Sequence, residues 1–209
     1  MLFRSTVRAQ LSDLDMARVA AFGGVPDTIT GTLTGGGTFS GEGATIGQLL
    51  QTAAGKGQLT VRSGTLKRLG LVRAVVLFFG RPSAESRGAA DDFERIDVSF
   101  ELARRVLSAS ALALRSRDVD LVGTGTMHLD GGALDARVDL SLSEELSAQA
   151  GTDLARFTRE GNRIVLPARV SGTSDRPRVS IDAGAAARRG LRNELQRRLG
   201  GILGGLRAP

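Results

Sequence analysis

Residues 92–143 read DFERIDVSFELARRVLSASALALRSRDVDLVGTGTMHLDGGALDARVDLSLS. Apolar residues recur there at every second position, which predicts strands with one apolar and one polar face. Asp130-Gly131-Gly132 predicts a hairpin turn, because glycine adopts positive φ without steric cost. We therefore expect a meander of four antiparallel strands. The side chains expected to face either a protein core or a lipid are those of Ile96, Val98, Phe100, Leu121, Met127, Leu134, Val138 and Leu140.

The residues before the meander alternate between strand and helix patterns. We expect strands over residues 3–11, 28–40 and around Leu59 and Val61, the last ending in a turn at Ser63-Gly64. We expect helices over 12–22, with Ser12 as N-cap, over 45–54 and over the apolar residues 66–79. Residues 81–91 are polar, and we expect a loop there.

The residues after the meander predict further short elements. A helix is expected over 144–150, a helical turn over 153–158, a strand over 164–170, a turn over 172–175 and a strand over 177–181. Pro167 cannot donate to a strand ladder, which places that strand at an edge or a bulge. Asp182 is a candidate cap for a helix over residues 183–203. The fold class is α+β and mainly antiparallel β: a curved sheet or groove with short helices and a C-terminal amphipathic helix.

Length and composition limit the architecture and the function. The 209 residues fit one domain over residues 1–182 with a basic helical segment over 183–209. The chain has no Cys, which excludes disulfides and thiolate metal sites. No stretch approaches the roughly 20 apolar residues that a spanning helix needs, and no signal peptide is visible. A strand pattern at the first residues leads us to expect a C-terminal piece of a longer protein.

Basic charge is concentrated in the last helix. Six arginines and one acid lie from Arg188 onward, against a net charge of +6 for the whole chain. A leucine stripe accompanies them at helical spacing, comprising Leu191, Leu195, Leu199, Ile202, Leu203 and Leu206. Such a helix either contacts an anionic membrane or a partner groove, or packs its leucines on the sheet and exposes its arginines. The candidate contact residues are Arg188, Arg189, Arg192, Arg197 and Arg198.

No residue pattern predicts catalysis or a cofactor. His128 is the only histidine, so no second imidazole or thiolate is present to complete a metal or triad site, and we expect an exposed strand histidine. The glycines over 35–43 lack the Gly-Lys-Ser/Thr of a phosphate loop and the third glycine of a dinucleotide motif. Aromatic platforms for nucleic acid would be phenylalanine alone. We expect a protein that is not an enzyme, holds no cofactor or metal and binds no nucleic acid.

The order of these elements resembles the C-terminal region of the AsmA family of bacterial envelope proteins. The resemblance covers most of the chain and rests on structural motifs in sequence order. They are Leu14-Asp15-Met16 before a helix, Ile29-Thr30-Gly31, the glycine-rich residues 37–43, residues 57–64, Asp92-Phe93, residues 121–129, Val170-Ser171-Gly172-Thr173, and Arg176-Pro177 with Val179. The family's N-terminal membrane anchor has no counterpart in this chain.

This resemblance implies an envelope protein tethered in the inner membrane and exposed to the periplasm. Its β-groove would carry phospholipid between the membranes and support outer-membrane biogenesis. The alternative is a periplasmic structural or assembly module whose terminal helix binds a protein partner. The helices at 66–79 and 183–203 could also fill the apolar face, and we favour such a closed core here because Leu71, Val75 and Phe78 need burial.

Strict alternation over two strands generates the first prediction. Replacing Val98 or Val138 by Asp should lower the thermal melting temperature strongly, because each change places an unpaired charge on the apolar face. Thermal denaturation followed by circular dichroism measures the effect. Melting of both variants at the wild-type temperature would contradict the assignment of this face.

Overall fold

One open antiparallel β-sheet dominates the protein, whose computed structural model describes residues 4–45, 48, 51–78, 91–149, 159–160 and 162–192. Its nine consecutive strands are β1 (Arg4–Asp15), β2 (Thr32–Glu42), β3 (Ala54–Leu66), β4 (Asp91–Ala103), β5 (Val106–Arg115), β6 (Val119–His128), β7 (Ala133–Leu142), β9 (Arg163–Thr173) and β10 (Pro177–Ile181). The two-residue strand β8 (Arg159–Glu160) pairs with β9 outside this path. Helices are α1 (Met16–Phe22), α3 (Leu71–Phe78), α4 (Glu144–Gln149) and a C-terminal helix over residues 183–192. The predicted mainly antiparallel fold is confirmed.

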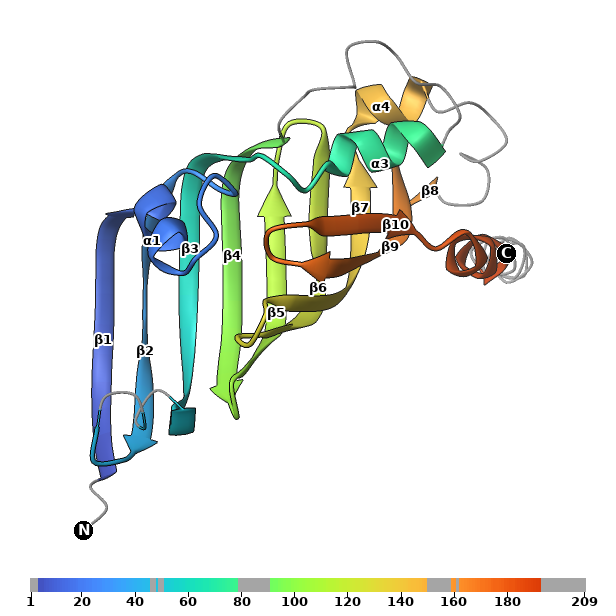
Figure 1. Ribbon diagram of the computed structural model, residues 1–209. Coiled ribbons are helices and arrows are strands. Elements are labelled where there is room, and N and C mark those ends of the chain that lie inside the picture. Colours follow the sequence, from blue (N-terminus) through green and yellow to red (C-terminus); the bar gives the residue numbers. More distant parts are fainter. Residues whose placement is uncertain are drawn as a thin grey trace, which may run out of the picture.

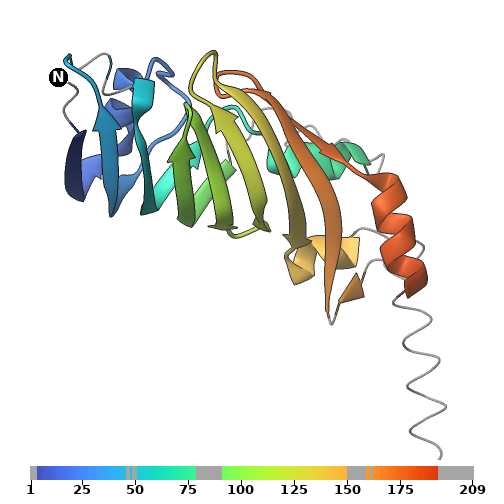
Figure 2. The same ribbon diagram turned by 90° about the horizontal axis from the view of Figure 1, so that it is seen from below.

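The strands follow one another along the sheet almost in chain order (Figure 1). Strand β1 forms one edge and β10 the other, and the C-terminal helix lies beyond β10. The strand direction turns along the sheet, so that β9 and β10 run across the direction of β1 in Figure 1. Figure 2 shows the resulting curvature from below. This turn follows from the right-handed twist of each strand, which accumulates over many neighbours.

The four-strand meander over residues 92–143 is confirmed as β4 to β7. Gly131 and Gly132 have φ of 74° and 66° in the β6–β7 turn, as the Asp-Gly-Gly signal predicts. The β4–β5 turn is made instead by Arg104 and Arg105, with φ of 49° and 60°. This pair carries no glycine, so the turn lacked its usual sequence signal.

The hydrophobic core occupies one half of the apolar face, toward one set of strand ends. A cross-strand row of buried residues forms its centre, comprising Leu33, Val61, Ile96, Leu114, Leu121, Leu140 and Leu166. Leu71 and Val75 of α3 are only 1% and 2% exposed on this cluster, and α1 and α4 pack at its margin through Met16, Val19 and Leu146. The expected burial of Leu71 and Val75 is therefore confirmed, whereas the side chain of Phe78 lies outside the described residues.

Two helices begin later than the sequence predicts, and an aspartate carboxylate fixes the start of each. Strand β1 continues through Ser12 to Asp15, whose carboxylate accepts a hydrogen bond from the Ala17 amide at 2.9 Å. Asp15, rather than Ser12, is therefore the N-cap of α1. Helix α3 begins at Leu71 instead of Leu66, and the Leu71 amide donates to buried Asp91 at 2.8 Å. That cap comes from the start of β4, which local sequence cannot show.

Strands β2 and β3 also have different limits from those predicted. Strand β2 begins at Thr32, and Ile29 makes only an isolated bridge to Leu66. The predicted turn at Ser63-Gly64 is wrong: β3 runs through it to Leu66, with Ser63 at φ 51° inside the paired strand. Residues 48 and 51–52 of the predicted helix over 45–54 are helical, whereas Thr45 and Ala53 are not and Ala54 starts β3. Residues 46, 47, 49 and 50 are not described.

The elements after the meander agree with the prediction in order and differ at Pro167 and at the end of β9, which runs through Thr173 into the turn predicted over 172–175. Helix α4 and β10 lie where expected, and Asp182 caps the C-terminal helix by accepting from the Ala185 amide at 2.7 Å. Strand β9 is interior, between β7 and β10, rather than at an edge. Pro167 is tolerated because β10 ends opposite Ala168. The helical turn predicted over 153–158 lies outside the described residues.

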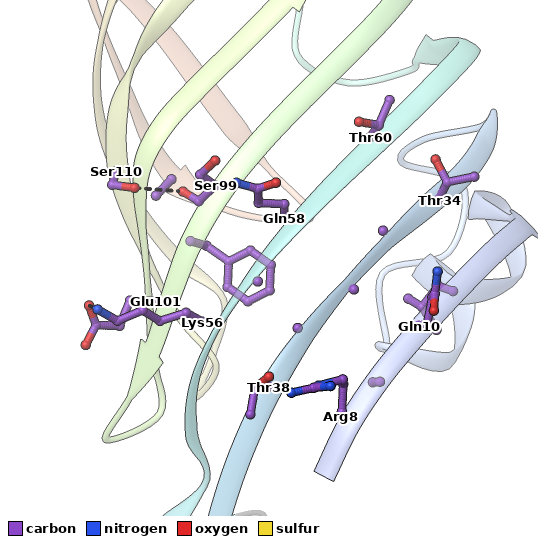
Figure 3. Close-up of a pocket in the computed structure, with 18 of the residues that line it drawn as sticks. Arg8, Gln10, Thr34, Thr38, Lys56, Gln58, Thr60, Ser99, Glu101 and Ser110 are labelled. Atoms are coloured by element: carbon purple, nitrogen blue, oxygen red, sulfur yellow. Dashed lines mark hydrogen bonds and ion pairs between the residues drawn. The ribbon is translucent and has the colours of Figure 1, made fainter.

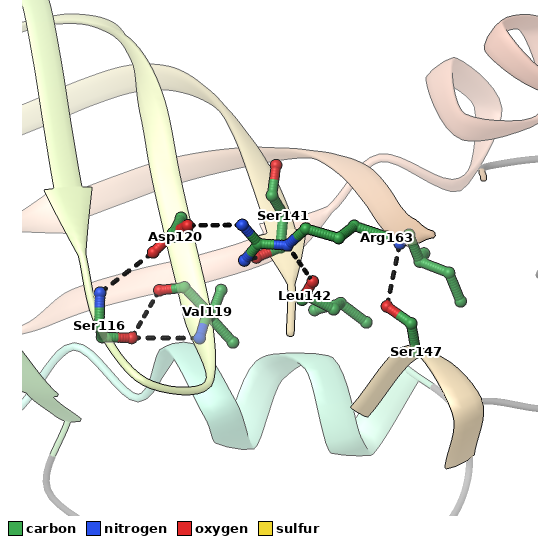
Figure 4. A network of polar contacts seen from close by, with 8 residues as sticks. Ser116, Val119, Asp120, Ser141, Leu142, Ser147 and Arg163 are labelled. Atoms are coloured by element: carbon green, nitrogen blue, oxygen red, sulfur yellow. Dashed lines mark hydrogen bonds and ion pairs between the residues drawn. The ribbon is translucent and has the colours of Figure 1, made fainter. Parts of the chain in front are cut away.

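Arg163 joins the ends of β6, β7 and β9 in one polar network (Figure 4). Its guanidinium donates to the Leu142 and Ser141 carbonyl oxygens at 2.7 and 3.1 Å and to the Asp120 carboxylate at 2.8 Å. Asp120 also accepts from the Ser116 amide at 3.1 Å. The planar guanidinium fork satisfies three acceptors at once, which lysine could not do with the same geometry. This network holds the strand ends beside α4.

Glycines on β2 and β3 leave room for two stacked rings. Phe39 and Phe100 have ring centroids 6.3 Å apart with an interplanar angle of 27°. A Cβ atom added to Gly57 would lie 2.7 Å from Cζ of Phe100 and 2.9 Å from the Gly36 carbonyl oxygen. The glycine-rich stretch that lacks a phosphate-loop motif therefore serves close packing within the sheet.

We predict that Gly57→Ala lowers the free energy of unfolding by about 1–3 kcal/mol, because the ring and backbone around the added methyl must shift. The matched control is Gly23→Ala, at a position with φ −74° where an added Cβ would make only ordinary contacts at 3.5 Å. The control should change the free energy of unfolding by less than about 1 kcal/mol. Urea denaturation of both variants measures the difference, and equal values would contradict the packing role of Gly57.

Candidate functional site

An uninterrupted row of apolar and glycine residues crosses eight strands at the end of the sheet away from the core. We call it the apolar row. Its members are direct register partners in the order Val7, Phe39, Gly55, Leu102, Leu107, Met127, Leu134 and Gly172. Directly opposed side chains on one face lie about 4.5–5.5 Å apart, so the row is continuous in space.

The apolar row is outside the core cluster although it shares the core's face of the sheet. None of its members belongs to the buried cluster or to the half-buried side chains packed against it. Phe39, Leu102, Leu107, Met127 and Leu134 are half-buried, and Val7 is 59% exposed. The helices described above pack on the other half of this face, so the side chains of the row retain apolar surface toward solvent.

Between the apolar row and the core, the next residues on the same face of each strand are mostly small. The adjacent row reads Ala9, Gly37, Gly57, Phe100, Ala109, Gly125 and Ala136. Apart from Phe100, these side chains are alanine or glycine and hardly rise above the backbone. The apolar row and this small-residue row together make a low apolar surface that runs across the strands.

The residues predicted to face a core or a lipid divide between these two regions. Ile96, Leu121, Val138 and Leu140 are buried in the core, and Val98 is half-buried against it. Phe100 is buried outside the core cluster, on Phe39. Met127 and Leu134 belong to the apolar row. Sequence alone does not identify the row's other members, because their alignment across strands depends on a register set by distant turns.

The opposite face of the sheet is polar and carries a hollow of about 1060 Å³ over β1 to β5. Its lining is rich in hydroxyl and amide side chains, including Gln10, Thr34, Thr38, Gln58, Thr60, Ser99 and Ser110, as Figure 3 shows. The charged lining residues are Arg8, Lys56 and Glu101. Lys56 and Glu101 form an exposed ion pair at 3.7 Å, and such pairs contribute little to stability. This face is suited to contact with water.

Ion pairs between neighbouring positions shift the pKa of carboxylates on the polar face. The Arg95 guanidinium donates to Asp97 at 2.6 Å and lowers the pKa of that carboxyl, with a further hydrogen bond from Thr60 at 2.7 Å. Arg169 likewise lowers the pKa of Asp135 through two hydrogen bonds at 2.9 Å. These carboxylates are held ionised at neutral pH, which gives no proton donor for general-acid catalysis at these positions.

The C-terminal helix contacts the polar face through Arg189. Its guanidinium donates to Asp139 on β7 and to Glu160 on β8, both at 2.7 Å, and these contacts raise the pKa of Arg189. Ala186 and Gly190, one helical turn apart, are buried, whereas Arg188 and Arg192 are exposed and Leu191 is 62% exposed. Arg189 therefore binds the sheet, and the first leucine of the predicted stripe is not packed on it. Arg197 and Arg198 lie outside the described residues.

The described part of the chain assembles no group of metal ligands. His128 is exposed at the end of β6, opposite Val106, and no cluster of three or more His, Asp or Glu residues that could hold a metal ion occurs among the described residues. No described helix is long and apolar enough to cross a membrane.

Comparison of this chain with family models, with curated proteins and with solved structures found no match.

The Arg189 contacts generate a prediction about the attachment of the helix. Arg189→Gln should increase the rate of amide hydrogen exchange over residues 183–192, because it removes the bridge to Asp139 and Glu160. Arg188→Gln is the matched control, with the same charge change at the exposed neighbouring position. Hydrogen exchange with mass spectrometry measures both, and equal protection in the two variants would contradict the anchoring role.

Proposed function

We propose that this protein is a non-enzymatic lipid-handling protein of the cell envelope, in which the apolar row and its neighbouring small residues shelter a phospholipid acyl chain. The observation that carries the proposal is the apolar row itself. It joins seven consecutive strands and β9 without a polar interruption, and it is separate from the core that stabilises the fold.

The dimensions of the row support an acyl ligand. Neighbouring strands are about 4.8 Å apart, so the row extends about 29 Å from Val7 to Leu134. One leaflet contributes about half of the roughly 30 Å hydrocarbon core of a bilayer, so an acyl chain is shorter than this row. Each CH₂ group moved from water onto apolar surface contributes about 0.8 kcal/mol. A chain could occupy several positions along the row at similar energy, which suits movement of lipid along the sheet.

The chemistry of the two faces also supports this function. Among the residues that the structure describes, the apolar face combines a core under helices with a row that no helix covers. The polar face carries hydroxyls, amides and ion pairs. Sheltering a lipid requires no bond to be made or broken, so neither a cofactor nor a catalytic residue is needed. The sequence resemblance to AsmA-family proteins leads us to place this activity in the periplasm, in phospholipid transport between the membranes and in outer-membrane biogenesis.

The second candidate function is an assembly module that binds an envelope protein through its terminal helix. The specific observation that favours it is the exposure of Leu191 on a helix whose Arg189 is already bound to the sheet. A helix anchored in this way presents Arg188, Leu191 and Arg192 outward. Association with an anionic membrane uses the same residues, and the lipid experiment below separates row-dependent from tail-dependent binding.

The lipid proposal predicts that protein purified from a bacterial host carries phospholipid, detectable by native mass spectrometry and by extraction. The double substitution Leu107→Gln/Met127→Gln should reduce bound lipid about tenfold or more, because two neighbouring polar side chains interrupt the row. Both residues lie outside the core cluster, so folding should persist.

The matched control is Phe22→Gln/Val122→Gln, which removes exposed apolar surface from α1 and from the polar face. This control should retain lipid at the wild-type level. Lipid-free wild-type protein that also fails to bind phosphatidylglycerol vesicles would exclude the lipid function. Equal lipid loss in both double variants would exclude the apolar row as the binding surface, and lipid loss only after removal of residues 183–209 would assign binding to the tail.

A further inference from the structure

Three arginines lie side by side on neighbouring strands of the polar face. Arg62 on β3 is the direct register partner of Arg95 on β4, which is the direct partner of Arg115 on β5. All three are exposed. Like charges directly opposite each other on one face of a sheet are destabilising, so this arrangement is unfavourable for the fold by itself.

The nearest carboxylates already bind a guanidinium group, either that of Arg95 itself or that of Arg163. Asp97 accepts hydrogen bonds from Arg95 and Thr60, and Asp120 on β6 accepts from Arg163 and the Ser116 amide. Glu94, next to Arg95 in sequence, forms no ion pair with the three arginines. Within the described residues, Arg62 forms no ion pair, and Arg115 has only the longer-range attraction of Asp97, which Arg95 already binds.

A hollow of about 320 Å³ adjoins this row over β4, β5 and β6. Asp97 and Ala113, two residues from Arg95 and Arg115 on the same strands, are part of its lining. Ala111 and Gly123 keep the lining low, and Ser99 and Ser110 supply hydroxyls. The hollow offers space beside the arginines for the remainder of an anionic ligand.

We propose that Arg62, Arg95 and Arg115 form a binding site for a phosphate-bearing ligand. Guanidinium groups bind phosphate through paired N–H donors, and three arginines at strand spacing extend over about 10 Å. One carboxylate, Asp97, faces Arg95 and attracts Arg115, so the three guanidinium groups keep an excess of positive charge. Arg95, fixed by Asp97, supplies its remaining N–H groups between Arg62 and Arg115. The site is on the opposite face from the apolar row, so it goes beyond the proposed acyl-chain function and does not depend on it.

The test measures binding of phosphate groups by the full chain at low salt in chloride buffer. Calorimetric titration with pyrophosphate examines a soluble ligand, and co-sedimentation with phosphatidylcholine vesicles with and without phosphatidylglycerol examines a lipid headgroup. We expect Arg62→Gln/Arg115→Gln to weaken binding about tenfold or more, because two charge-assisted contacts are lost. The matched control, Arg8→Gln/Arg178→Gln, removes two exposed arginines that are not neighbours in the strand register and should weaken binding less than about twofold.

Selective loss in the first double variant supports the site, and the probe that binds identifies the phosphate source. Equal loss in both double variants would overturn the proposal, because it would show diffuse attraction by net charge. Failure of the wild-type protein to bind either probe would also overturn it. The first double variant should melt no lower than wild type, since it relieves like-charge repulsion. A lower melting temperature would assign the arginines a stabilising role and would overturn the proposal as well.

Discussion

The register of the antiparallel sheet is the constraint on which the rest of this structure depends. Because side chains alternate between faces, a slip of one residue in any strand pair would move an entire strand's apolar set into water. The observed pairing instead aligns Leu33, Val61, Ile96 and their partners as one buried row. The same pairing aligns the apolar row near the opposite ends of the strands. Core and candidate site therefore arise from the same register.

Local irregularities preserve this register where the strands bend. The pairing shifts between Leu11 and Leu14 on β1 and between Ala109 and Leu112 on β5. Bulges of this kind add a residue to one strand and increase its local twist. Apolar side chains remain on one face beyond each bulge, so curvature is gained without loss of the face on which the helices pack.

In the described part of the chain, helices cover only part of the apolar face, which distinguishes this sheet from a closed sandwich. The helices α1, α3 and α4 pack on the half of the apolar face that holds the core cluster, where Leu71 and Val75 of α3 are buried. Helix α3 covers that half as expected, whereas the described residues 183–192 of the helix expected over 183–203 do not join the core and contact the polar face through Arg189. The apolar row lies beyond the covered half. On the polar face, most carboxylates of β4 to β7 are bound by specific partners. The positive charge of Arg62, Arg95 and Arg115 is larger than the negative charge that remains beside them.

The sequence by itself determined the strands of the meander, their apolar face, the Gly131-Gly132 turn and the Asp182 cap, because each depends on residues within a few positions of one another. It also put the eight candidate apolar residues on one face, without deciding that five of them lie in or against the core cluster and that Phe100, Met127 and Leu134 lie outside it. Tertiary structure alone decided that Asp91 caps α3, that β9 is interior, and that Arg189 faces the sheet. Tertiary structure also decided that Val7 and Leu134 lie in one row across the strands, as do Arg62 and Arg115. Each of these rows depends on the register of several strand pairs at once, and local sequence does not determine these registers together.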